Sequence, residues 1–370
     1  MSPAEPAPGV AAPPTIREAT PVDHDALIAC MDGVFHESGG ERVQEFDRAY
    51  WNWEYRDAPH GAMVVVASDA NGLCGYYHAV LQDLHVDGRL VRVAMVQDVG
   101  TRASHRGRGV FREMGGYALE ALRRRGVEFI YTFPNQKSLP SFVRNHGYTI
   151  VARVPVLVRP LDLGRALAER ARLGGPGRAI GDAGAAVLRL ARARRARLEP
   201  GERVEAVDTP PAELQGFALA RGGTGTIGLA RTPDYLRWRF VASPHRSYRI
   251  HVLTRAGAAR AYLVTRHAEI LGAPVALVMD LGHEPGEEPA LARLIDLRAL
   301  DETRAGRVAS VAMCLGAERR VLRRAGYFPI PERLNPRPFN LLVKDLASTP
   351  HPGLFDPGRW RITLADWDVY

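Results

Sequence analysis

The chain has 370 residues, 46% of them apolar, which is enough for two cores of ordinary domain size. Its formal charge of +8 comes almost entirely from arginine. Because the base composition of a genome can produce the same bias, we expect no nucleic-acid partner. The three cysteines, at positions 30, 74 and 314, are odd in number and far apart, which argues against a disulfide framework or a zinc site. We expect no metal and a cytoplasmic location.

The N-terminal part predicts a tail followed by an α/β unit. Residues 1–14 are rich in Pro and Ala but lack a basic region and an apolar core, which indicates a disordered tail rather than a signal peptide. Residues 16–20 and 23–34 follow, which the family resemblance given below likens to a first strand and a first helix. No apolar run reaches the roughly 18 residues that span a bilayer, so we expect no membrane span.

A glycine- and arginine-rich loop lies at the centre of this unit. The apolar run 91–96 predicts a strand, residues 112–124 predict a helix, and Arg106-Gly107-Arg108-Gly109-Val110-Phe111 lies between them. A helix start leaves backbone N–H groups unpaired at the positive end of the helix dipole, and glycine lets a ligand approach the backbone. The loop therefore predicts a site for the diphosphate of a nucleotide-like cofactor, with an ordinary turn as the alternative.

The residues around this loop resemble a known superfamily. The series Gln97–Thr101, the loop, the helix 110–125, the strand 127–132, Asn135, Phe142 and Gly147-Tyr148 resembles motifs A and B of the GNAT superfamily of CoA-dependent N-acyltransferases. The resemblance covers about residues 15–160. Trp51-Asn52-Trp53-Glu54-Tyr55 and Phe133-Pro134-Asn135 are similar to elements of a group of longer bacterial acetyltransferases.

The resemblance implies an α/β fold, a mixed central sheet with helices on both faces, and acetyl-CoA or another acyl-CoA as co-substrate. It implies that the backbone of Val99 and Thr101 contacts the pantetheine arm. The residues it assigns to the diphosphate are Arg106, Gly107, Arg108, Gly109, Val110 and Phe111. Asn135 matches a residue that meets the pantetheine arm near the sulfur, and capping of the next helix is its alternative role.

The expected reaction is direct attack of a primary amine of a small molecule on the thioester in a ternary complex. Asp98 is the carboxylate nearest to the expected splayed strand and is the candidate general base, with a buried structural role as the alternative. Trp53, Tyr55 and Tyr131 are candidates for the wall of the acceptor pocket, with core packing as the alternative. The resemblance places a proton-donating tyrosine where this chain has Val143, so another group or solvent must protonate the thiolate.

Two matches inside the chain predict a duplicated domain. Residues 50–60 recur at 235–245, and residues 142–148 recur at 321–327, so the two matches have nearly the same separation along the chain. We expect a GNAT-like catalytic domain at 15–160, a degenerate GNAT-like domain at 204–346 and a C-terminal extension at 347–370. The second copy is expected to lack the cofactor site, because the acidic segment 280–288 occupies the place of the loop.

Residues 161–203 predict an Ala- and Arg-rich helical linker. A solvated helix at the junction is one interpretation, and a docking face for an acidic carrier protein that delivers a longer acyl chain is another. A non-catalytic module that senses acyl-CoA or binds nucleic acid is the alternative from another class. The sequence predicts no oligomeric state.

Overall fold

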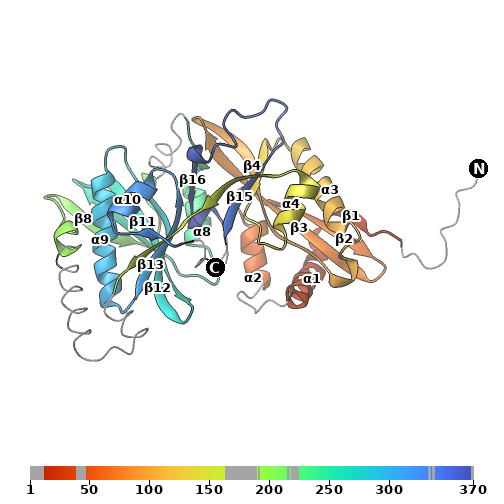
Figure 1. Ribbon diagram of the computed structural model, residues 1–370, viewed down its shortest axis with the longest axis horizontal. Coiled ribbons are helices and arrows are strands. Elements are labelled where there is room, and N and C mark those ends of the chain that lie inside the picture. Colours follow the sequence, from red (N-terminus) through yellow and green to blue (C-terminus); the bar gives the residue numbers. More distant parts are fainter. Residues whose placement is uncertain are drawn as a thin grey trace, which may run out of the picture.

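The computed structural model describes residues 12–38, 47–162, 192–214, 225–331 and 338–367, together with Leu190, Phe217 and Asn335. Two α/β halves lie side by side, the first in red to yellow and the second in green to blue (Figure 1). Sixteen strands form one hydrogen-bonded network across both halves. Most of the predicted tail 1–14 and most of the predicted linker 161–203 lie outside the described residues. No described helix is long and apolar enough to cross a membrane.

The first half follows the predicted order of elements. Its elements are β1 (Thr15–Glu18), η1 (Pro21–Asp23), α1 (His24–Glu37), α2 (Arg48–Trp51), the π-helical turn η2 (Asn52–Arg56), β2 (Ala62–Asp69), β3 (Gly72–Val86), β4 (Arg89–Thr101), η3 (Ala103–His105), α3 (Val110–Arg124), β5 (Phe129–Thr132), α4 (Leu139–His146) and β6 (Thr149–Val154). Helix α3 forms because Val110, Met114, Ala118 and Leu122 recur every four residues, which gives one apolar face. That face packs on the sheet in one of the buried clusters.

The second half repeats this order after a strand that continues from the first. Its elements are β7 (Val156–Pro160), β8 (Glu202–Val207), β9 (Ile227–Leu229), α8 (Pro233–Phe240), β10 (Arg249–Arg255), β11 (Ala258–Ile270), β12 (Ala273–His283), α9 (Glu288–Arg304), β13 (Ala309–Leu315), α10 (Glu318–Arg324), β14 (Phe328–Pro329), β15 (Phe339–Asp345), η5 (Pro357–Arg359), β16 (Trp360–Thr363) and η6 (Leu364–Asp366).

The register of the strands confirms the predicted duplication. Strands β4 and β5 pair in parallel over Val93–Val96, and β12 and β13 pair in parallel over Val275–Val278. When these two stretches are superposed, Val96-Gln97-Asp98-Val99-Gly100 aligns with Val278-Met279-Asp280-Leu281-Gly282, a match that the sequence comparison missed. The two halves are therefore two copies of one α/β fold in tandem, each with a mixed sheet.

The halves exchange one strand each. Strand β7 follows β6 of the first half but pairs with β13 and β14 of the second. Strand β15 comes from the second half and lies between β5 and β6 of the first, as Figure 1 shows in dark blue. The expected stretches 15–160 and 204–346 thus each contribute a strand to the other half.

The recurring tryptophans meet at the junction of the halves. The rings of Trp53 and Trp238 stack with centroids 5.2 Å apart. Trp53 Nε1 donates to Trp238 O at 2.8 Å, and Trp238 Nε1 donates to Trp53 O at 2.7 Å. This reciprocal contact relates the two copies as an approximate twofold axis would, and it makes Trp53 a packing residue of the junction.

Candidate active site

Strand β4 opens away from β5 at its carboxyl end. The pairing between them ends at Val96 and Thr132, so within the described chain residues 97–101 have a strand neighbour only on the β3 side. Tyr77 pairs with Val99 but the next residue of β3 pairs with Gln97, which leaves Asp98 as the extra residue of a β-bulge. The predicted splay is therefore a V-shaped opening between the carboxyl ends of β4 and β5, the V, and Val99 lies on its β4 side.

The bulge gives Asp98 an unusual backbone. Its φ of 43° lies in the left-handed region, which Asp and Asn adopt more readily than most residues. His78 Nδ1 lies 2.8 Å from Asp98 O, so the ring N–H donates to that carbonyl. The other ring nitrogen, Nε2, accepts from Trp51 Nε1 at 3.2 Å. Because one nitrogen donates and the other accepts, His78 is a neutral imidazole with its hydrogen on Nδ1.

Two neighbouring side chains set the electrostatics of the bulge. Burial lowers the pKa of His78 to about 4, so it is uncharged at neutral pH and both its nitrogens are occupied. The hydroxyl of Tyr55 donates to Asp98 Oδ2. Burial, followed by the nearby Asp98 charge, raises the pKa of Tyr55 well above its ordinary value, so the phenol keeps its proton and remains a donor. Asp98 itself is only partly buried.

The bulge also brings Gln97 to the same helical turn. Gln97 Nε2 donates to Glu54 Oε1, and Glu54 is only 1% exposed. Gln97 and Asp98 follow each other in β4, yet they contact Glu54 and Tyr55, which follow each other in η2. Plain strand alternation would have directed the two side chains to opposite faces. No pattern in the sequence indicates the role of Glu54, because that role depends on the bulge.

The loop before α3 has the geometry of an anion cradle. Gly107 and Gly109 have φ of 75° and 83°, and a Cβ added at Gly107 would meet open space. The first intrahelical bond runs from Glu113 N to Gly109 O at 3.0 Å, so the N–H groups of residues 110–112 have no acceptor within the helix. Arg106 Nε donates to Thr101 O at 3.0 Å, and both Arg106 and Arg108 are exposed.

Phe111 turns its ring away from the loop. The ring centroid lies 5.5 Å from that of Phe142 and 5.0 Å from that of His146, beside the buried Val110. Its N–H therefore stays at the helix start while its side chain contributes to the core. The predicted cofactor residues Thr101 and Arg106 to Phe111 therefore lie around one helix start. Val110 and Phe111 contribute only backbone groups to it, because their side chains pack in the core.

Of the remaining residues considered for the site, Asn135 is exposed, whereas Tyr131 and Val143 pack in the core. Asn135 Oδ1 accepts from the backbone N–H groups of Lys137 and Ser138, both at 2.9 Å, so this exposed residue caps the turn that precedes α4. Tyr131 is 1% exposed, and its hydroxyl donates to Gln82 in the core. Val143 packs against the α3 cluster.

In the second copy, the aspartate equivalent to Asp98 is fully enclosed. Arg231 Nε donates to Asp280 Oδ2 at 2.8 Å, and Arg231 Nη1 donates to Asp366 Oδ1 at 2.5 Å. Thr363 Oγ1 donates to Asp280 Oδ1 at 3.0 Å. Asp280 is 0% exposed, and these contacts fix the C-terminal segment instead of facing a ligand.

That C-terminal segment fills the second V. Strand β16 pairs with the end of β13 through Thr363 and Cys314, and η6 contacts both β12 and β13. The loop before α9 is also shorter than the loop before α3, because it covers only positions 284–287 whereas the first copy has positions 102–109 there. Its Glu287 accepts from Arg255 at 2.7 Å. The second copy therefore has neither an open V nor a cationic cradle.

The Acetyltransferase (GNAT) domain family model matches residues 15–151. No protein with curated annotation matches the chain in sequence. Among solved structures, a GCN5-related N-acetyltransferase from Anabaena variabilis is similar over 90% of this chain and 73% of its own, with a TM-score of 0.62 at 10% identity. Saccharomyces cerevisiae N-myristoyltransferase with bound myristoyl-CoA is similar over 94% and 86%, with a TM-score of 0.56 at 11% identity.

A tandem GNAT protein from the clavulanic acid biosynthesis pathway shares the architecture across its whole length. It is similar over 91% of this chain and 100% of its own, with a TM-score of 0.54 at 13% identity. The TM-scores show a common fold, and the family match covers the half that contains the V and the cradle. Residues 15–151 thus match the acetyltransferase (GNAT) domain family, and the chain as a whole has the fold of two GNAT-like domains in tandem.

Proposed function

We propose that the first copy transfers an acetyl group from acetyl-CoA to a primary amine of a small molecule, at one site per chain. The observation that carries this proposal is the partly buried Asp98 on a bulge beside the open V, with a cradle for an anion at the next helix start. The diphosphate binds the N–H groups of residues 107–111 with Arg106 and Arg108 nearby. The pantetheine arm follows the backbone of Val99 and Thr101, and Asn135 Nδ2 flanks it from the turn before α4.

In the proposed reaction the amine nitrogen attacks the thioester carbonyl carbon and the C–S bond breaks. Asp98 accepts the proton that the nitrogen loses, while Tyr55 holds the carboxylate in place through its hydroxyl. The departing thiolate takes a proton from water, since a thiol of ordinary pKa near 8.5 is largely protonated at neutral pH. This route needs no donor at Val143. Trp53 and Tyr131 support the site through packing.

The register of the V favours a short acyl group. Gln97 and Phe133 are the residues directly after the last β4–β5 pair, so they face each other across the opening. Gln97 is held by Glu54, and the ring of Phe133 stacks on Trp367 with centroids 4.8 Å apart. Because both side chains are held by these contacts, we propose that they limit the acyl chain to a short one, which favours acetyl over a longer acyl group or a carrier-bound chain.

Calorimetric titration of the full chain with acetyl-CoA tests the site. We expect one acetyl-CoA per chain, and at least about tenfold weaker binding in Gly109→Glu, because the carboxylate opposes the diphosphate and the side chain strains a left-handed backbone. Gly116→Glu is the matched control on the exposed side of the same helix, where an added Cβ meets no atom. Two bound molecules per chain, or equal loss in both variants, would refute the assignment.

A further inference from the structure

Tyr76 of β3 is the first-copy counterpart of Tyr262 of β11. Tyr76 pairs with Gly100 of β4, two residues after the bulge at Asp98. Tyr262 pairs in the same way with Gly282 of β12. A Cβ added at Gly100 would lie 2.5 Å from the Tyr76 hydroxyl, and one added at Gly282 would lie 2.5 Å from a ring carbon of Tyr262. In each copy, therefore, a glycine on the neighbouring strand makes room for the same tyrosine.

The hydroxyl groups of the two tyrosines have different partners. Tyr262 donates to Asp280 Oδ2 at 2.9 Å, whereas no residue that the structure describes forms a hydrogen bond with the Tyr76 hydroxyl. Tyr76 is only 6% exposed, and its ring lies 5.7 Å from that of His78, which donates to Asp98 O. Burial, followed by the nearby Asp98 charge, raises the pKa of Tyr76 well above its ordinary value. The phenol is therefore a protonated donor close to Asp98, with no hydrogen bond to it.

A difference in the preceding helical turn accounts for this. Tyr55 of η2 corresponds to Phe240 of α8 in the internal repeat, and Phe240 has no hydroxyl. In the second copy Tyr262 is thus the tyrosine that donates to the aspartate, whereas in the first copy Tyr55 does so. Tyr55 therefore frees Tyr76 from the structural role of its counterpart. A buried hydroxyl without a partner destabilises a fold, and phenylalanine would fill the same space without that cost.

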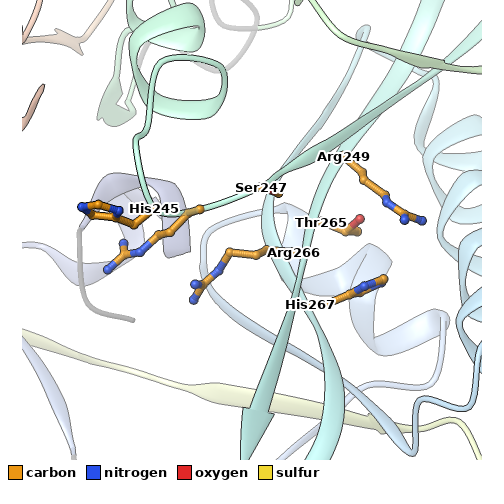
Figure 2. Close-up of a pocket in the computed structure, with 7 residues that line it drawn as sticks. His245, Ser247, Arg249, Thr265, Arg266 and His267 are labelled. Carbon is orange, nitrogen blue, oxygen red and sulfur yellow. The ribbon is translucent and has the colours of Figure 1, made fainter. Parts of the chain in front are cut away.

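The tyrosine–aspartate pair of the second copy is enclosed, whereas that of the first copy adjoins the V. Tyr262 is 1% exposed and Asp280 is 0% exposed. A cavity of about 230 Å³ opens farther along β11, and its lining residues, which lie between positions 245 and 249 and between 265 and 267, do not include this pair (Figure 2). Asp98, in contrast, is only partly buried, and it lies on the strand that opens away from β5. The Tyr76 hydroxyl therefore lies close to a carboxylate that a ligand can reach.

We infer that the Tyr76 hydroxyl binds the acceptor amine, and that this acceptor has an oxygen atom close to its amino group. The inference rests on the proposed acetyl transfer, in which Asp98 takes the proton of the amine nitrogen. A hydroxyl beside that carboxylate meets the atoms next to the nitrogen. Because a protonated phenol donates a hydrogen bond, the group it meets is an oxygen with a lone pair. Amino alcohols and amino acids have such an oxygen, and simple alkylamines do not.

Acetylation of matched amine pairs by the full chain tests the inference. Ethanolamine is compared with propylamine, and glycine with isobutylamine, because each pair has the same size and differs in its oxygen atoms. We expect kcat/KM to be about tenfold higher for the oxygen-containing member of at least one pair, and that pair distinguishes an alcohol from a carboxylate. In Tyr76→Phe this ratio should fall to about one, through a higher KM for the oxygen-containing amine. An unchanged ratio in Tyr76→Phe would overturn the inference alone, whereas acetylation of no amine by the original chain would refute the proposed function.

Tyr262→Phe is the matched control, because it removes the same hydroxyl from the second copy. It breaks a hydrogen bond to a carboxylate, so it should lower Tm by about 2 °C and leave the ratio between paired amines unchanged. Tyr76→Phe should not lower Tm, because it removes a hydroxyl that forms no hydrogen bond in the free protein. This measurement does not depend on acetyl transfer. An equal loss of Tm in both variants would show that Tyr76 has the structural role of Tyr262 and would overturn the inference.

Discussion

Replacing Asp98 by Asn separates its proposed chemistry from its structural role. Asn also tolerates the left-handed backbone of the bulge and can still accept from the Tyr55 hydroxyl, so the geometry should persist. What is lost is the ability to take a proton. General-base catalysis contributes about 10²- to 10⁴-fold, so we expect kcat to fall by that factor, which corresponds to about 3 to 5 kcal/mol of transition-state stabilisation.

The assay follows thiol release from acetyl-CoA with a panel of primary amines, together with calorimetry of acetyl-CoA binding. The KM for acetyl-CoA should stay within about twofold of its original value, because the cradle is untouched. Tyr55→Phe removes one hydrogen bond to the carboxylate and should lower kcat about tenfold. Asp57→Asn, an exposed change directly after η2, is the matched control. Unchanged kcat in Asp98→Asn would refute the role of Asp98 as base.

Two further changes test acyl selectivity and acid sensitivity. Phe133→Ala should raise kcat/KM for propionyl-CoA relative to acetyl-CoA by about fourfold, the value of one buried methylene of about 0.8 kcal/mol. Phe339→Ala, which also removes a ring contact with Trp367 but from β15, should not change this ratio. Equal effects of the two variants would contradict the proposed role of Phe133 in acyl-chain selection. The pKa of His78 is about 4 in the folded protein and near 6.5 in the unfolded chain, so the unfolded chain binds the proton more tightly. The contribution of neutral His78 to stability is therefore fully present above pH 6.5 and is lost as the pH falls toward 4. The free energy of unfolding in urea should therefore fall by about 2 kcal/mol more between pH 7 and 5 than it does for His78→Gln, and parallel pH profiles would disprove this.

The elements and the duplication were predictable because they leave local signals. Helix α3 follows from its four-residue apolar spacing, and the Trp53 and Trp238 repeat marks the two copies. The bulge at Asp98 left no such signal, because it is a mismatch in register with β3 that no single segment encodes. For the same reason, the contact of Gln97 with Glu54 followed only from the structure.

The sequence also did not reveal which distant strands pair with each other. Strand β15 has the alternating apolar pattern of any sheet strand, and that pattern does not say which neighbours it will have. The sequence also did not reveal which residues the C-terminal extension contacts. In the structure its Asp366 pairs with Arg231 and its β16 closes the second V, so the degeneracy of the second copy involves both an altered loop and an occupied cleft.

The exchange of β7 and β15 makes the two domains one unfolding unit. Phe129 of β5 pairs with Asp345 of β15, which lies near the other end of the chain, so the first sheet is incomplete until nearly the whole chain has been synthesised. Separated halves would each expose the two strand edges that flank the missing strand, a template for aggregation. The second copy is therefore needed for the first to fold. Heat or urea should unfold both domains in a single transition.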